Sequence, residues 1–152
     1  INDLYYTDTK AFIINKLLIT YAFRNRDLKL QVINNKNIIE PDKNYIIIMK
    51  TRLKILIQDY KTKDVYGIKS IINTDKDLYK AVVDYYEEFG DKFLLSSNNI
   101  SRELSKIIVY GLNETELFRL LIHSSKNLQE AKKYGETRGT GLNTIEQHYT
   151  SI

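Results

Sequence analysis

The sequence predicts an α+β fold: an antiparallel sheet with a central hairpin over about residues 28–71, one helix before it and a helical C-terminal half. Strand-like patterns cluster in the first half of the chain and helical periodicity in the second. Strands grouped apart from helices are typical of α+β architecture rather than of alternating α/β units. The 152 residues, 43% of them hydrophobic, have the size and composition of one globular domain spanning 1–152.

The first predicted element is a helix over residues 9–23. Its apolar residues, such as Phe12 and Leu17, recur at roughly helical spacing. Thr7 or Asp8 is placed to cap its N-terminus.

The sheet is expected to begin with residues 28–33, where apolar and polar residues alternate. The asparagine-rich stretch 34–37 indicates a turn. Ile38 and Ile39 are therefore expected to begin an antiparallel return strand.

Residues 45–50 and 53–60 predict the central hairpin. The run 45–49 is apolar on both faces, as in a strand buried inside a sheet, whereas Leu53, Ile55 and Ile57 share one face of the second strand. A turn at 51–52 would pair residues whose numbers add to 103. One more strand is expected at 65–71.

Helical periodicity follows, and glycines or capping residues mark most boundaries. Asp75 or Thr74 can cap the first of these helices, and Gly90 ends it. The predicted helices span residues 74–90, 100–110, 114–123 and 126–134, and the glycine-rich stretch 135–141 predicts a loop.

Composition limits the possible functions. The chain has no cysteine, which excludes disulfides, thiol catalysis and cysteine-bound zinc. No apolar run is long enough for a membrane span, and the N-terminus lacks the pattern of a secretory signal. We therefore expect a soluble, cytoplasmic protein with no membrane partner. The net charge of +4 favours an anionic partner such as nucleic acid, or serves solubility alone.

One motif suggests catalysis. Pro41-Asp42, then sixteen residues, then Asp59-Tyr60-Lys61, resembles the signature of the PD-(D/E)xK metal-dependent nucleases. The resemblance covers only residues 38–70. It implies that Asp42 and Asp59 hold Mg²⁺ through hard oxygen ligands and that Lys61 stabilises charge at the scissile phosphate.

The pattern departs from that family, because the helix at 9–23 lacks the acidic residue that usually precedes the sheet. Glu40 is the candidate replacement ligand. Together with the composition, the resemblance implies a DNA or RNA nuclease acting as a toxin or defence effector.

The expected hairpin register would place Asp42 opposite Lys61 and Asn44 opposite Asp59, bringing the charged side chains together at the open end. The following Lys63 and Lys69 are candidates for contact with a phosphate backbone. The alternative is that these residues are solvated charges at a hairpin end.

Residues 101–121 resemble a helix-turn-helix, with Arg119 among the exposed side chains of its second helix. This reading predicts a non-enzymatic module that binds nucleic acid. The alternative is an ordinary helical hairpin that buries Ile107 and Leu117, in a domain that binds a protein partner.

The two histidines allow a further hypothesis. His123 and His148 would act as general base and general acid in a metal-independent ribonuclease, because histidine titrates near neutrality. Arg138, which lies between two glycines of the stretch 135–141, would contact a phosphate. Alternatively, His123 only caps a helix C-terminus.

Overall fold

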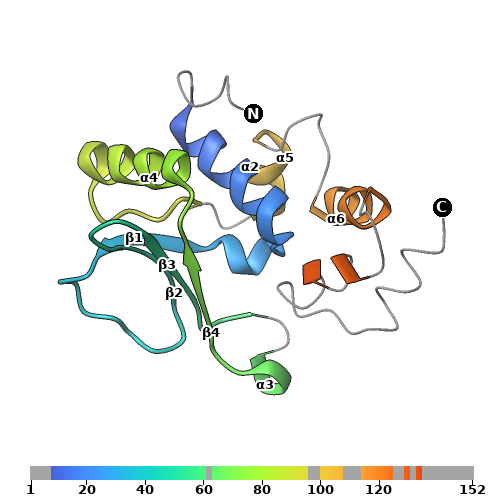
Figure 1. Ribbon diagram of the computed structural model, residues 1–152, viewed down its shortest axis with the longest axis horizontal. Coiled ribbons are helices and arrows are strands. Elements are labelled where there is room, and N and C mark those ends of the chain that lie inside the picture. Colours follow the sequence, from blue (N-terminus) through green and yellow to red (C-terminus); the bar gives the residue numbers. More distant parts are fainter. Residues whose placement is uncertain are drawn as a thin grey trace.

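The computed structural model describes residues 8–60, 63–95, 100–107, 114–124, 129–130 and 133–134. It confirms the α+β fold, with a helix before the sheet and helices after it (Figure 1). The elements in order are α2 (Thr9–Tyr21), η1 (Asn25–Leu28), β1 (Leu30–Asn34), β2 (Asn44–Ile48), β3 (Leu53–Ile57), α3 (Lys63–Tyr66), β4 (Lys69–Asn73), α4 (Lys76–Phe89), α5 (Ile100–Ser105) and α6 (Glu114–His123).

The sheet is mixed, so the expectation of a purely antiparallel sheet was wrong. Its strand order is β1-β2-β3-β4; β1 pairs with β2 in parallel, and the other pairs are antiparallel. Ile38 and Ile39 form no return strand, and Ile38 is 88% exposed. The predicted turn is present, closed by the Asn37 N–H donating to the Asn34 carbonyl at 3.2 Å. The chain then crosses back, and β2 starts beside the start of β1.

A second, small core lies on the sheet face opposite α2 and α4, beside the crossover at 35–43. Ile33, Tyr45 and Ile47 form this second cluster and are each at most 5% exposed. The Glu40 N–H donates to the Tyr45 hydroxyl at 3.0 Å, which ties the crossover to β2. The parallel pairing is thus held by a short connection that packs on the sheet without a helix.

The hairpin of β2 and β3 is confirmed, but its register differs from the prediction. Ile48 pairs with Leu53, and Tyr45 with Leu56, so paired numbers add to 101. The Met49 N–H donates to the Arg52 carbonyl at 2.9 Å, so residues 50–51 lie at the turn, one position before the predicted 51–52. As expected, β2 lies inside the sheet.

The strand predicted at 65–71 begins later than expected. Val65 belongs to the short helix α3, and β4 starts at Lys69. Gly67, with φ +76°, lies between them in a conformation that favours glycine. Its carbonyl accepts a hydrogen bond from the Tyr60 hydroxyl.

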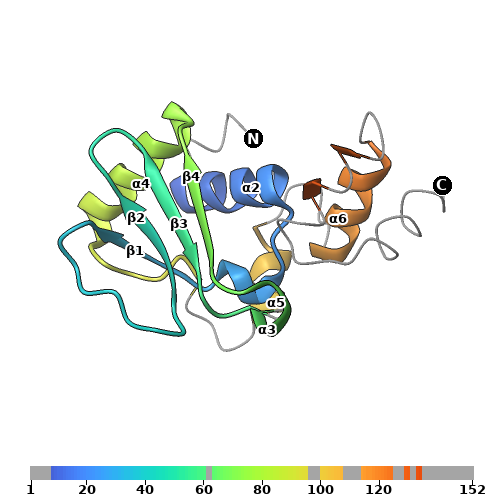
Figure 2. The same ribbon diagram turned by 60° about the horizontal axis from the view of Figure 1, so that its bottom comes forward.

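Helices α2 and α4 cover the same face of the sheet, and α5 and α6 lie beside α2 (Figures 1 and 2). The Asp8 side chain caps α2 by accepting the Ala11 N–H at 3.0 Å, as predicted. Asn15, fully buried in this helix, donates to the carbonyls of Ala11 and Ile107 at 2.8 and 2.9 Å. Helix α2 is therefore the central element of the core.

The later helices agree with the predictions where the structure describes them, except that α5 ends at Ser105, earlier than the predicted helix at 100–110. Asp75 caps α4 by accepting the N–H groups of Asp77 and Leu78, and Gly90 ends it. Helix α6 has the predicted bounds, and residues 129–130 and 133–134 are helical. The expected turn around Gly111 and the loop at 135–141 lie outside the described residues. In the described part of the chain, no helix is both long and apolar enough to cross a membrane.

Candidate functional site

One end of the sheet gathers most of the charged residues that the sequence singled out. Because β1 and β2 are parallel and β3 and β4 alternate in direction, the starts of β1, β2 and β4 meet the end of β3 there. Helices η1 and α3 adjoin these strand ends in the chain (Figure 2). We call this region the sheet-end site.

Asn44 and Gln58 hold the backbone of this site in place. Asn44 is 2% exposed, and its Oδ1 accepts the N–H groups of Gln58 and Asp59 at 2.7 and 2.8 Å. Its Nδ2 donates to the Asp59 carbonyl at 2.8 Å. Gln58 Nε2 donates to the carbonyls of Glu40 and Lys43 at 3.0 and 2.8 Å. The segments that carry the acidic residues are therefore joined by buried amide groups.

Asp59 forms an ion pair with Arg26. The guanidinium donates to Asp59 Oδ1 through Nε at 2.9 Å and also through Nη2. This hydrogen bond raises the pKa of Arg26 above its ordinary value. Both side chains are open to solvent, with 56% of Arg26 and 37% of Asp59 exposed. Asp59 is thus available to an incoming cation.

Asp42 lies in a turn after Pro41 and has a φ of +61°, in the left-handed region. Aspartate tolerates this conformation better than most residues. Its carboxylate accepts the ammonium of Lys63 at 2.5 Å and is 77% exposed. Glu40 pairs separately with Lys43 at 2.5 Å.

The observed register changes which residues face each other. Its extension to the open end would set Asp42 across from Asp59 rather than from Lys61, since paired numbers add to 101. The predicted cross-strand pairing of Asp42 with Lys61 was therefore wrong, and Lys61 itself lies outside the described residues. Lys63, a candidate for phosphate contact, is the ion-pair partner of Asp42.

Lys69 occupies a more enclosed part of the site. Its Nζ lies 4.8 Å from the centre of the Tyr60 ring and 5.8 Å from that of Tyr66. Burial lowers the pKa of Lys69, while the negative charge of Asp27 acts in the opposite direction. Asp27 is 2% exposed and accepts the Arg24 N–H at 2.9 Å.

Sequence reasoning missed Arg26 and Asp27 as members of this site. They belong to η1, before the sheet, and Arg26 is 33 positions away from its partner Asp59. No local pattern signals such a contact. The cluster of three charged residues in the Arg24–Asp27 stretch was the only trace in the sequence.

Two further predicted residues that the structure describes are not part of the sheet-end site. Arg119 is exposed on α6. His123 is the last residue of that helix, where the helix dipole favours a basic side chain. His148 and Arg138 lie outside the described residues, so the histidine pair and the Arg138 contact stay predictions.

The donor chemistry of the site suits a hard cation, although its ligands are few. Among the residues that the structure describes, no cluster of three or more His, Cys, Asp or Glu side chains could hold a metal ion. Mg²⁺, however, keeps several waters and is commonly held by one or two carboxylates. Asp42 and Asp59 match that smaller requirement in chemical type.

No protein-family model, curated protein or solved structure matches this chain.

Proposed function

We propose that this protein cleaves phosphodiester bonds in DNA or RNA with Mg²⁺, using Asp42 and Asp59 as metal ligands. One observation carries the proposal: each of these solvent-accessible carboxylates at the end of the hairpin holds a different cation, Lys63 or Arg26. Phosphodiester cleavage needs both kinds of group, carboxylates for the metal and cations for the phosphate. In this structure the carboxylates and the basic side chains neutralise each other as ion pairs.

In the proposed reaction the acidic and basic side chains of the site exchange each other for the metal ion and the phosphate. Asp42 and Asp59 would hold the Mg²⁺ ion, and their present partners Lys63 and Arg26 would then be able to bind phosphate oxygens. Arginine suits this task because its planar fork of donors matches phosphate. Bound Mg²⁺ would lower the pKa of a water molecule and neutralise charge on the phosphate. Lys61 is expected to be a further cation that stabilises charge at the scissile phosphate. A role as a toxin or defence effector rests on the sequence alone.

The rigid backbone supports the assignment of Asp59. Asn44 accepts its N–H and donates to its carbonyl, so the position of this residue does not depend on its ion pair. A positioned carboxylate loses little conformational entropy when it binds a metal.

The test is a cleavage assay on single- and double-stranded DNA and RNA with Mg²⁺, Mn²⁺ or EDTA. Asp59→Asn and Asp42→Asn remove one charge each, and asparagine tolerates the left-handed conformation of position 42. We expect metal-dependent cleavage that falls at least a hundredfold in either variant. Glu88→Gln, at an exposed position of α4, is the matched control and should cleave normally.

Other outcomes identify other functions. Absence of cleavage on every substrate refutes the proposal. Cleavage that survives EDTA but is lost in His148→Ala would identify the histidine mechanism. A salt-dependent gel shift without cleavage would identify a binding module, because phosphate contacts release counterions.

A further inference from the structure

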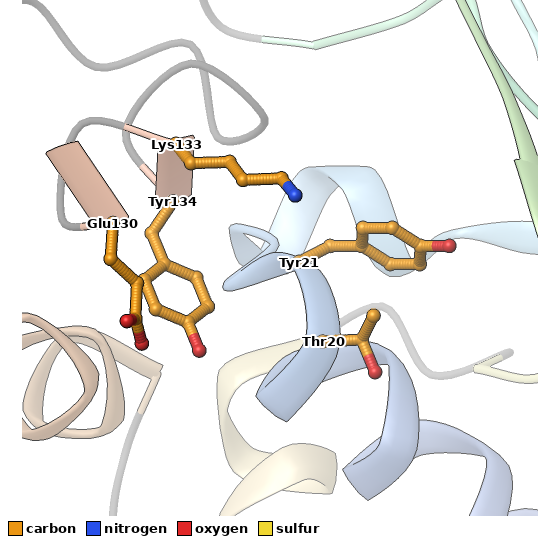
Figure 3. Close-up of a pocket in the computed structure, with 5 residues that line it drawn as sticks. All are labelled: Thr20, Tyr21, Glu130, Lys133 and Tyr134. Atoms are coloured by element: carbon orange, nitrogen blue, oxygen red, sulfur yellow. The ribbon is translucent and has the colours of Figure 1, made fainter. Parts of the chain in front are cut away.

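A cavity of about 460 Å³ lies between the end of α2 and the helical residues near position 130. None of its lining residues belongs to the sheet-end site. We call this cavity the tyrosine pocket. Figure 3 shows its lining residues, which come from the end of α2 and from the residues near position 130. They are Thr20, Tyr21, Glu130, Lys133 and Tyr134.

Packing holds both tyrosine rings of this pocket in place. Tyr21 stacks on Phe23 with ring centroids 5.1 Å apart, and its hydroxyl accepts the Asn73 side-chain amide at 2.7 Å. Tyr134 packs against a small buried cluster that includes Phe118. Burial raises the pKa of both phenols, so they stay neutral at physiological pH. The pocket therefore has one aromatic wall, Tyr134, that forms without a ligand, whereas Figure 3 shows the Tyr21 ring directed away from Tyr134.

The polar groups of the pocket carry opposite charges. Glu130 and Lys133 both line the cavity. Figure 3 shows the Glu130 carboxylate beside the Tyr134 phenol, and after burial its negative charge also raises the pKa of Tyr134. In Figure 3 the Lys133 side chain instead extends toward the end of α2 that carries Tyr21.

This combination selects a class of ligand. Aromatic side chains stack on the faces of nucleobases, and a carboxylate accepts hydrogen bonds from an exocyclic amino group. An ammonium group binds phosphate. The cavity volume lies in the usual range for small-molecule sites, roughly 300–1,000 Å³. A two-ring purine base makes a larger stacking contact with an aromatic side chain than a one-ring pyrimidine base does.

We propose that the tyrosine pocket binds a purine nucleotide, with the base against Tyr134, its amino group on Glu130 and its phosphate on Lys133. The proposal is independent of the nuclease activity, because it uses other residues. Mononucleotides are therefore a suitable probe even if the protein cleaves nothing.

The test is calorimetric titration of the whole chain with AMP, GMP, CMP, adenosine and inorganic phosphate. We expect AMP or GMP to bind several-fold more tightly than CMP, and adenosine to bind more weakly than AMP. Lys133→Gln should reduce the difference between AMP and adenosine. Asp59→Asn should leave nucleotide binding unchanged, which separates this result from the outcome of the cleavage assay.

The aromatic wall is tested with a matched pair of variants. Tyr134→Ala should weaken purine nucleotide binding about tenfold or more, whereas Tyr134→Phe, which keeps the ring, should change it less than threefold. Circular dichroism checks that both variants are folded. The proposal is overturned if no nucleotide binds at millimolar concentration, if phosphate alone binds as tightly as AMP, if CMP binds as tightly as AMP and GMP, or if Tyr134→Ala binds AMP as tightly as the wild type.

Discussion

Asn44 and Asp59 are joined by a reciprocal pair of hydrogen bonds: Asn44 Oδ1 accepts the Asp59 N–H, and Asn44 Nδ2 donates to the Asp59 carbonyl, both at 2.8 Å. A buried side chain here does what a neighbouring strand would do, since the ladder between β2 and β3 ends at Tyr45 and Leu56. The chain can thus leave the sheet at Asp59 and remain ordered.

Asn44→Ala should therefore destabilise the protein. The change leaves the buried N–H of Gln58 without its acceptor and removes the bonds to Asp59. Each unsatisfied buried group costs about 1–3 kcal/mol, so we expect the free energy of unfolding to fall by about 2–4 kcal/mol. Urea denaturation measures this. Asn35→Ala, at an exposed turn position, should change it by less than about 0.5 kcal/mol.

Arg26→Gln separates the electrostatic role of the sheet-end site from its stability. The Arg26–Asp59 pair is exposed, and such pairs contribute about 0–1 kcal/mol, so the free energy of unfolding should barely change. Because Asp59 loses its competing cation, we expect tighter Mg²⁺ or Mn²⁺ binding by calorimetry, together with weaker binding of DNA or RNA. Equal metal affinity in the variant and the wild type would contradict the exchange of partners.

Asn15→Leu tests the polar link inside the core. Asn15 donates to the Ile107 carbonyl, and this bond connects α2 to the end of α5. Leucine cannot donate, so we expect the free energy of unfolding to fall by about 1–3 kcal/mol despite the gain in apolar surface. Thr20→Ala, at an exposed position of the same helix, is the control. A more stable Asn15→Leu protein would show that the hydrogen bond matters less than the burial.

Asp75 makes stability depend on pH. Burial by itself would raise its pKa, but hydrogen bonds from the Leu78 N–H and from Lys16 outweigh burial and lower it. A carboxyl with a depressed pKa stabilises the fold above its unfolded-state pKa, about 3.9, and this contribution is lost as the pH falls through the folded-state value. Asp75→Ala should cost about 1 kcal/mol at pH 7 as a lost helix cap. The loss should shrink toward pH 2, measured by urea denaturation across this range.

Gly90→Ala tests the end of α4. Gly90 has φ 77° and ψ −150°, a region that is almost restricted to glycine. An added Cβ would meet no atom within 4 Å, so the cost comes from the backbone alone. We expect the melting temperature to fall, by an amount equivalent to about 1–3 kcal/mol. Glu88→Ala in the same last turn should have little effect.

The sequence determined the elements whose signals are local. Apolar spacing and a capping aspartate were enough for α2 and α4, and α6 has the predicted bounds, because a helix is stabilised by residues three and four positions apart. The buried face of β3 followed from simple alternation. The position of Asp42 and Asp59 at the open end of the hairpin likewise followed from their places beside β2 and β3.

Tertiary structure alone decided how these elements combine. The parallel pairing of β1 and β2, the register of the hairpin and the pairing of Arg26 with Asp59 all join residues that are distant in the sequence. Strand periodicity reports which face is buried but not which strand is the neighbour, and a shift by two residues preserves the buried face. The tyrosine pocket, whose walls are more than a hundred residues apart, had no local signal at all.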